Sequence, residues 1–394
     1  MIKRGILCAF IALAVTVSGF SDDIRIDGDA PTFKPNNPND PIAKGFSESF
    51  NTELGKAFNE MRDEIQGMIN DMIPSGFSSD DLLNGFGTSS VFASHGATMR
   101  AYADYKFLSI SMGSMLGLKF PEGSTQVLLN GLSSGGFDLD SIGDTTFGIN
   151  PQFFSIHIGF NPSYLIKIMP ENLFLGLRLG FFGLPTLPIQ MSDDVSADLN
   201  FNTFTIGLTA NYQLVPSVNL GLIKWRGVNV GSGLIFQTTK LDLTVPFGEK
   251  RETTTLQQSG YSATLDLVLD PTAALNIDIN TVTIPVEIFT AINLLFLNIP
   301  LGLGVDIGFG KSALSIGMQS DVKIESNNSD APISPDKNGS LSVKLENDHA
   351  PTAFNLKLMT GLGFSFGDKF VIDIPITFYL QDGYNLGFTI GLRF

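Results

Sequence analysis

Cysteine is almost absent from this sequence, whose 394 residues include only Cys8. Cys8 lies within an apolar run, Gly5–Val17, which follows the basic residues Lys3 and Arg4 and is itself followed by small residues. A basic start, an apolar run of this length and a small-residue exit are typical of a secretion signal, so we expect residues 1–21 to be cleaved. The exported chain would then have no cysteine, which excludes disulfide bonds and thiol catalysis.

Charged residues are also scarce in this sequence. They make up 16% of the chain, below the roughly one quarter found in soluble domains, whereas 43% of the residues are hydrophobic. Acidic residues outnumber basic ones by 39 to 24, and the net charge of −15 argues against nucleic acid as a partner, because a negatively charged surface repels phosphates. A chain with so few charges can solvate little of its surface, which fits a protein that faces lipid.

Long apolar runs and catalytic motifs are missing as well. After residue 21, no window of about 18 residues is continuously apolar and uncharged, so we expect no membrane-spanning helix. The sequence has no phosphate-binding loop, dinucleotide fingerprint or zinc-ligand spacing, and its three histidines, His95, His157 and His349, stand without a supporting set of catalytic partners. We therefore expect no enzymatic activity, no cofactor and no metal site.

Residues 22–97 precede the regular strand pattern and divide into a linker and a helical part. Residues 22–44 are polar and rich in proline, asparagine and aspartate, which is typical of an extended linker. Between residues 46 and 72, apolar side chains recur every three or four positions, which predicts an amphipathic helix; a short second helix could occupy Asp80–Asn84. The first helix could plug a barrel, or it could lie in the periplasm against a partner or a second copy of the chain.

From about residue 98 onward, apolar and polar residues alternate, as in strands with one apolar face. We count roughly 12 to 14 segments of about ten residues, and strands of about 9–11 residues span a bilayer when tilted, whereas soluble strands are near five or six. Because unpaired backbone groups are costly in hydrocarbon, a sheet there must close on itself. We therefore predict an all-β fold: a transmembrane antiparallel β-barrel of about 12–14 strands over residues 98–394, preceded by an amphipathic α-helical segment.

The last strand carries the most specific motif. Large apolar or aromatic side chains occupy every second position: Tyr384, Leu386, Phe388, Ile390, Leu392 and Phe394. This pattern resembles the terminal insertion signal of bacterial outer-membrane β-barrels, which implies that the barrel-assembly machinery and the lipid bilayer of the outer membrane are partners. The common signal has glycine where this sequence has Thr389, between Gly387 and Gly391.

Two groups of barrels are similar to this sequence. The region 98–394, with the stretch Phe86–Arg100 that leads into it, resembles predicted outer-membrane proteins of spirochaetes. The long-chain fatty-acid transporters, which are barrels with a helical N-terminal hatch, are a looser match. Their early Asn-Pro-Ala motif is missing, and Asn150-Pro151 and Asn161-Pro162 come too late to replace it. That resemblance implies passage of a hydrophobic substrate.

Charged residues within the predicted strands fall on the polar face, which we expect to line the lumen: His157, Arg178, Asp266, Asp278, Glu287, Asp306, Lys357, Asp373 and Arg393. A charge on the lipid face at mid-membrane costs about 2–4 kcal/mol, so inward placement is favoured. These residues could set ion selectivity, contact a solute, or brace the wall in pairs. Glycine fills many other inward positions, which leaves room for a wide lumen or for a plug.

These patterns favour a barrel that passes solutes across the outer membrane, either porin-like or as a channel for hydrophobic substrates; the sequence does not identify the solute. The alternative is a surface-exposed adhesin or structural protein whose loops bind host or cell-surface partners. The polar insertion between Glu325 and Pro351 and the regions 121–147, 185–199 and 246–258 are candidate surface loops. A third interpretation is a soluble, secreted all-β domain.

Overall fold

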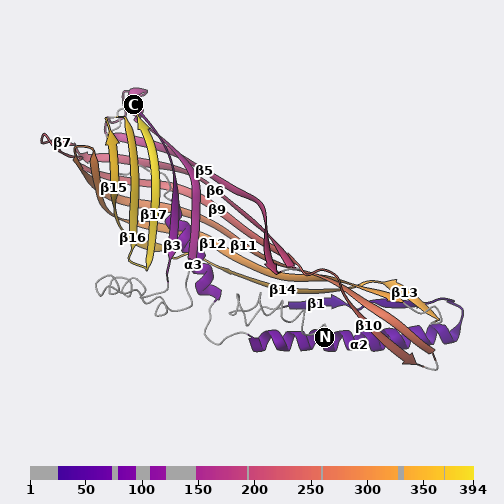
Figure 1. The fold of residues 1–394 in the computed structure, drawn as a ribbon. Helices are drawn as coiled ribbons and strands as arrows, with labels where there is room; N and C mark the ends of the chain where they lie inside the picture. The colour runs from indigo at the N-terminus through magenta and orange to yellow at the C-terminus, as the bar shows by residue number, and fades with distance from the viewer. Residues whose placement is uncertain are drawn as a thin grey trace.

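The chain folds around a closed ring of antiparallel strands (Figure 1). The computed structural model describes residues 25–72, 79–94, 107–120, 148–192, 195–258, 261–326, 332–367 and 369–394. Within this part of the chain the ring contains ten strands: β3 (Leu108–Lys119), β4 (Gly148–Phe160), β5 (Leu173–Ser192), β6 (Val195–Val215), β9 (Val228–Pro246), β11 (Tyr261–Leu294), β12 (Leu297–Ser326), β15 (Phe354–Phe366), β16 (Phe370–Tyr379) and β17 (Gly383–Arg393). The ring closes because β12 pairs with both β11 and β15.

The predicted antiparallel barrel with a preceding helical segment is confirmed, but ten described strands form the ring instead of 12–14. The difference comes from strand length: β11 has 34 residues and β12 has 30. Residues 265–269 and 275–279, which the alternation presents as separate segments, both belong to β11. Alternation shows that a residue is in a strand, but it does not show where a strand leaves the ring.

Five further strands and a helix build a second body, here called the extension, on the far halves of β11 and β12. Its sheet runs β10 (Lys250–Gln258), β11, β12, β14 (Gly339–His349), β1 (Arg25–Asp29). A two-stranded sheet of β2 (Thr32–Pro35) and β13 (Ile333–Lys337) lies beside it, and α2 (Pro41–Met72) runs beneath it (Figure 1). The predicted surface loops at 185–199, 246–258 and 325–351 therefore consist largely of strands.

α2 is fastened to the extension by polar and apolar contacts. Asn51 bonds both backbone groups of Phe33 in β2, accepting from its N–H at 2.8 Å and donating to its carbonyl at 2.9 Å. Phe58 packs into a buried cluster with Leu269, Met318, Val322, Leu341 and Val343. The predicted helix at 46–72 is thus present, but it covers the extension and lies outside the ring.

Polar and apolar side chains exchange faces where β11 and β12 leave the ring: the buried face is polar within the ring and apolar in the extension. In the ring, the inner face of β11 carries the buried Thr281 and Thr283, while the outer face carries the exposed Val286. Further along the same inner face, Ile277 and Ile279 are buried in an apolar cluster. A strand in a bilayer needs an apolar outer face, whereas a strand in water needs a polar one. The apolar outer face of β11 therefore ends where the strand passes from the ring into the extension.

The opposite end of the barrel carries the turns and the C-terminus. There lie the 3₁₀ helix η2 (Pro162–Tyr164), β7 (Val218–Asn219), β8 (Ile223–Trp225) and the short turns β11–β12 and β15–β16. β7 and the C-terminus are far from α2 (Figure 1). Among the described residues, no helix is long and apolar enough to cross a membrane.

Candidate functional site: the barrel interior and its helix

A helix, α3 (Ser79–Ala93), occupies the end of the ring that adjoins the extension, and contacts β3, β4, β11, β12, β14 and β17. Its N-terminal half is in the extension, where Leu83 packs with Ile277, Ile279, Leu314 and Leu345. Its C-terminal half is wholly enclosed, since every side chain from Thr88 to Ala93 is buried. The sequence suggested residues 46–72 as a candidate plug; in the structure the helix inside the barrel is α3.

Glycines in the wall let α3 approach closely. A Cβ on Gly117 would lie 2.2 Å from the Ser89 carbonyl oxygen, and one on Gly383 would lie 2.1 Å from the Phe92 ring. Both distances are far below van der Waals contact, so a larger residue at either position would displace the helix. Elsewhere in the ring, a Cβ on Gly176 would lie 2.2 Å from His157 Nε2. The inner glycines therefore admit the helix and neighbouring side chains, and at these positions they do not widen the lumen.

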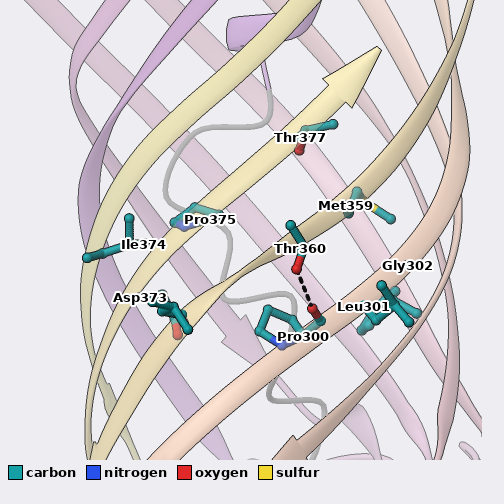
Figure 2. A pocket seen from close by; sticks show the side chains of 11 residues that line it. Pro300, Leu301, Gly302, Met359, Thr360, Asp373, Ile374, Pro375 and Thr377 are labelled. Atoms are coloured by element: carbon teal, nitrogen blue, oxygen red, sulfur yellow. Dashed lines mark hydrogen bonds between the residues drawn. The ribbon is translucent and has the colours of Figure 1, made fainter. Parts of the chain in front are cut away.

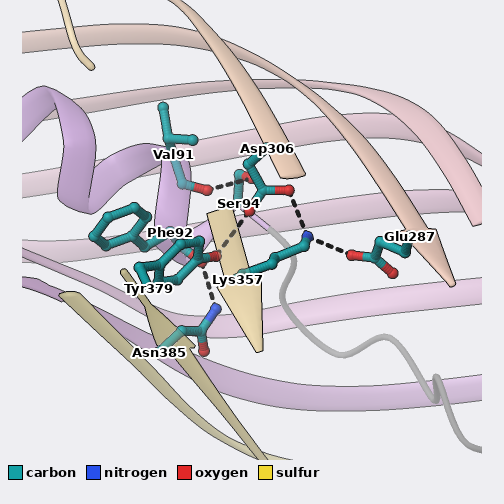
Figure 3. A network of polar contacts seen from close by, with 8 residues as sticks. All are labelled: Val91, Phe92, Ser94, Glu287, Asp306, Lys357, Tyr379 and Asn385. Atoms are coloured by element: carbon teal, nitrogen blue, oxygen red, sulfur yellow. Dashed lines mark hydrogen bonds and ion pairs between the residues drawn. The ribbon is translucent and has the colours of Figure 1, made fainter. Parts of the chain in front are cut away.

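A buried polar network joins the C-terminal end of α3 to the wall (Figure 3). Lys357 Nζ lies 2.5 Å from both Asp306 Oδ1 and Glu287 Oε1, and the Tyr379 hydroxyl donates to Asp306 Oδ2 at 2.8 Å. Asn385 Nδ2 donates to the Phe92 carbonyl oxygen. The Lys357 and Asp306 side chains are fully buried. One lysine between two carboxylates is stable only as a unit, because removing a partner leaves an uncompensated charge in a medium of low dielectric constant.

A second polar cluster fills the other side of the ring. Arg178 is completely buried and donates to Gln152 Oε1, and Gln152 in turn donates to Thr205 Oγ1 at 2.5 Å. His157 Nε2 lies 3.2 Å from Thr209 Oγ1. These side chains come from the neighbouring strands β4, β5 and β6 and contact one another along the inner face of the wall. The two clusters together make the ring a packed polar core in the described structure.

The structure places most of the predicted lumen residues on the inner face. Those that are buried there are His157, Arg178, Glu287, Asp306, Lys357, Asp373 and Arg393. Lys357, Asp306 and Glu287 are brought together, although they are distant in sequence. Any role in selectivity or solute binding stays a prediction.

Asp266 and Asp278 were wrongly predicted to line the lumen. Both lie in the part of β11 that belongs to the extension, where the alternation has changed phase. Asp278 is on the solvent side and pairs with Lys240 at 3.3 Å. Asp266 is buried next to Arg251, at 3.2 Å, outside the ring. Hydrogen bonds to Glu249 and Glu325 raise the pKa of Arg251, so this group stays charged. A polar residue between two apolar ones has the same sequence pattern in the ring and in the extension.

Several residues of the interior were missed by the sequence reasoning. Tyr379 and Asn385, both in contact with Phe92, were taken only as members of strands. The enclosed half of α3 was read as part of a connection. A signal was available: Gly85, Gly87, Thr88, Ser89 and Ser90 form a run of small residues, which permits close packing of a helix.

The alternating residues of the last strand point outward. Leu386, Phe388 and Leu392 are each more than two-fifths exposed on the outer face of β17. β17 pairs with β16 and β3, and so forms the seam between the first and last strands of the ring. The assembly role of Tyr384, Leu386, Phe388, Ile390, Leu392 and Phe394 remains a prediction.

A recess interrupts the wall where prolines break the hydrogen-bonded ladder (Figure 2). Pairing of β12 with β15 skips from Asn298 to Leu301, around Pro300, and pairing of β16 with β17 skips around Pro375. The recess is small, with a cavity volume of about 30 Å³, and is lined by residues of both sheet faces, such as the buried Met359 and the exposed Leu362. Thr360 Oγ1 donates to the Pro300 carbonyl at 3.2 Å, which satisfies a backbone group in the gap.

Among the described residues, no group of three histidine, cysteine or acidic side chains could hold a metal ion. The model of the Lsa36-like family matches residues 44–394. No curated protein matches the chain.

Solved structures show a distant likeness. The translocator domain of the autotransporter NalP from Neisseria meningitidis is 9% identical, with 73% of this chain and 88% of that chain covered and a TM-score of 0.26. The CymD monoaromatic hydrocarbon channel is 10% identical, with 79% and 98% covered and a TM-score of 0.23. The toluene transporter TodX from Pseudomonas putida is 9% identical, with 79% and 97% covered and a TM-score of 0.22. Values this low say nothing about function.

Proposed function

We propose that this chain, which belongs to the Lsa36-like family, is an outer-membrane anchor that holds its folded extension at the cell surface to bind other macromolecules. The observation that carries this proposal is the packed barrel interior. Side chains on opposite sides of the ring, such as Arg178 and Asp306, are completely buried, and α3 fills the mouth on the extension side. A barrel packed in this way would hold a body in the membrane rather than conduct solutes.

The outer face of the ring supports a membrane location. Exposed aliphatic and aromatic side chains cover it on successive strands, including Leu208, Leu234, Ile288, Leu303 and Phe388. Such an apolar band on a closed barrel is stable in hydrocarbon, because closure pairs the strands around the whole ring and leaves no open sheet edge. Export by a cleaved signal and passage through the barrel-assembly machinery are part of the same proposal.

The lengths of the connections orient the barrel. At the turn end, the connections between ring strands are residues 161–172, 216–227, 295–296 and 367–369, none of them longer than 12 residues. At the other end, residues 120–147 join β3 to β4, and β11 and β12 continue into the extension. Outer-membrane barrels have short periplasmic turns and longer extracellular loops. The extension therefore belongs on the outer surface and the C-terminus in the periplasm.

Cysteine labelling tests this arrangement cleanly, because Cys8 is the chain's one cysteine and lies in the predicted signal. Lys323→Cys in the extension and Lys369→Cys in a turn both place a thiol at an exposed position. In intact cells, a membrane-impermeant maleimide should label Lys323→Cys, whereas Lys369→Cys should react only after lysis. Equal labelling of both, or the reverse order, would contradict the proposed display of the extension.

Solute passage is the second candidate function, and the polar character of the interior favours it. If α3 left its position, the inner face that it covers would line a hydrated lumen, with Lys357, Asp306 and Glu287 at its mouth. In this case the chain is a channel whose helix acts as a gate.

A reversible disulfide between α3 and the barrel wall distinguishes the anchor from the gated channel. A Cβ on Gly308 would lie 2.8 Å from Val91 Cγ2, so Gly308→Cys with Val91→Cys would place two sulfurs within reach of a disulfide. In liposomes, a gated channel should release a small entrapped dye when the pair is reduced and retain it when the pair is oxidised. The anchor predicts retention in both states, and in the unmodified chain. Release by the unmodified chain would overturn the anchor.

A further inference from the structure

Apolar side chains are exposed on three neighbouring turns at the end of the barrel that carries the C-terminus. We call this surface the apolar rim; it consists of Leu165, Ile168, Leu220, Leu222, Leu295 and Phe296. Their exposed fractions run from 56% for Phe296 to 91% for Ile168. The three turns connect β4 to β5, β6 to β9 and β11 to β12, which are consecutive in the ring, so the rim is continuous over these strands. Exposed apolar patches of this kind mark membrane or protein contacts.

These turns are ordered structures that hold their apolar side chains outward. In the first, Asn161 Oδ1 accepts from Ser163 N at 3.0 Å, and Asn161 Nδ2 donates to the Glu171 carbonyl at 2.6 Å. In the second, Leu220 N donates to the Ile223 carbonyl at 2.8 Å. Leu295 N donates to the Leu222 carbonyl at 3.2 Å and so joins the second turn to the third. Because these backbone groups are bonded within the rim, the turns can enter a poorly hydrated environment.

The rim is basic in a protein that is acidic as a whole. Its turns carry Lys167 and Lys224, with one acidic residue, Glu171; in the neighbouring β15–β16 turn, Asp368 balances Lys369. Lysine beside exposed apolar side chains is the pattern of surfaces that lie in the headgroup region of an anionic leaflet.

The rim also continues the apolar outer face of the barrel. Leu294 and Ile292, which are exposed on β11, lead directly to Leu295, and Leu214 on β6 leads to the turn with Leu220. Lipid that covers the outer face of these strands would therefore extend over the turns without a polar break.

We propose that the apolar rim is embedded in the periplasmic leaflet, with its aliphatic side chains among acyl chains and its lysines at anionic phospholipid headgroups. This inference rests on the proposed membrane location and goes beyond it, because turns of a barrel need only reach the aqueous side. The rim would fix the depth and tilt of the barrel and thus the height of the extension above the membrane.

Trp225 provides the test, since it is the only tryptophan in the chain and lies in β8, next to the rim. Its indole N–H donates to Thr290 Oγ1 at 2.8 Å, so it reports on a defined position. The full chain would be reconstituted in vesicles of phosphatidylcholine and phosphatidylglycerol with ordinary or brominated acyl chains. We expect brominated lipid to remove most of the tryptophan emission, and aqueous iodide to leave it unchanged. Quenching by iodide and not by bromine would place the rim in water and overturn the proposal.

Matched variants show whether the apolar side chains of the rim are what keeps Trp225 away from water. Leu220→Asp with Leu222→Asp should make Trp225 accessible to iodide and shift its emission to the red, whereas Leu220→Phe with Leu222→Phe should keep the unmodified behaviour. Emission that neither quencher affects would mean that protein covers the rim, which also overturns the proposal. If the chain fails to float with the vesicles at all, the membrane location itself is wrong, and that outcome is seen before any fluorescence is measured.

Discussion

Phe92 of α3 and Tyr379 of β16 stack with their ring centroids 3.7 Å apart and their planes at 13°. The Tyr379 hydroxyl at the same time donates to Asp306, which is paired with Lys357. One side chain thus links the helix inside the barrel to the buried charges of the wall. The position of α3 and the pairing of these charges should therefore respond together to substitution.

Substitutions of Tyr379 should separate these two contributions. Tyr379→Phe keeps the stacking on Phe92 but removes the donor to Asp306, and we expect a loss of about 1 kcal/mol of stability. Tyr379→Ala also removes the ring and leaves a cavity, so a loss of about 3–5 kcal/mol is expected. The measurement is the temperature at which the folded band converts to the unfolded band on SDS gels. Equal shifts for both variants would mean that the stacking contributes nothing.

Lys357→Met should be strongly destabilising, by about 3–5 kcal/mol, because it leaves Asp306 and Glu287 buried without their counter-charge. The triple variant Lys357→Met, Glu287→Gln, Asp306→Asn removes all three charges and should recover part of that loss. Denaturant midpoints of the three proteins in detergent measure the effect. A single variant as stable as the unmodified chain would show that the three groups do not depend on one another.

Gly117→Val should expel α3 from the barrel, because a Cβ at this position would meet the Ser89 carbonyl at 2.2 Å. Gly45→Ala in α2 is the matched control: its Cβ would meet nothing within 4 Å, and the change should be neutral or stabilise by up to about 1 kcal/mol. Limited proteolysis followed by mass spectrometry reports whether cleavage within residues 79–94 appears. Protection of these residues in both variants would contradict the close packing of helix and wall.

The proposed membrane location predicts a boundary within β11, which can be tested with arginine at two positions of its outer face. Ile288→Arg places the charge among lipid-facing side chains and should cost about 2–4 kcal/mol in folding into bilayers. Asn276→Arg lies on the same face in the extension, beyond the reversal of the alternation, and should cost little. Folding yields in vesicles at increasing urea concentration compare the two. Similar costs would place the boundary elsewhere.

The sequence alone determined the class of fold. Residues 370–394 alternate so regularly that two long strands of a hairpin follow directly, and the observed β16 and β17 match them. The scarcity of charge and the exclusion of membrane-spanning helices left a closed sheet as the arrangement that pairs every backbone group in hydrocarbon. The first is a property of local residue order and the second of composition, so both can be predicted from the sequence alone.

Tertiary structure decided the number of strands in the ring, the place of Asp266 and Asp278, and the identity of the helix inside the barrel. A residue such as Asp278 has apolar neighbours on both sides in sequence, and this pattern is identical whether the polar face looks into a lumen or into water. α3 is short and rich in small residues, so its own sequence gives it little amphipathic character, and its enclosure depends on glycines such as Gly117 and Gly383 in distant strands. Contacts between residues so far apart in the chain arise only when the ring closes, because closure brings the first, middle and last strands around one helix.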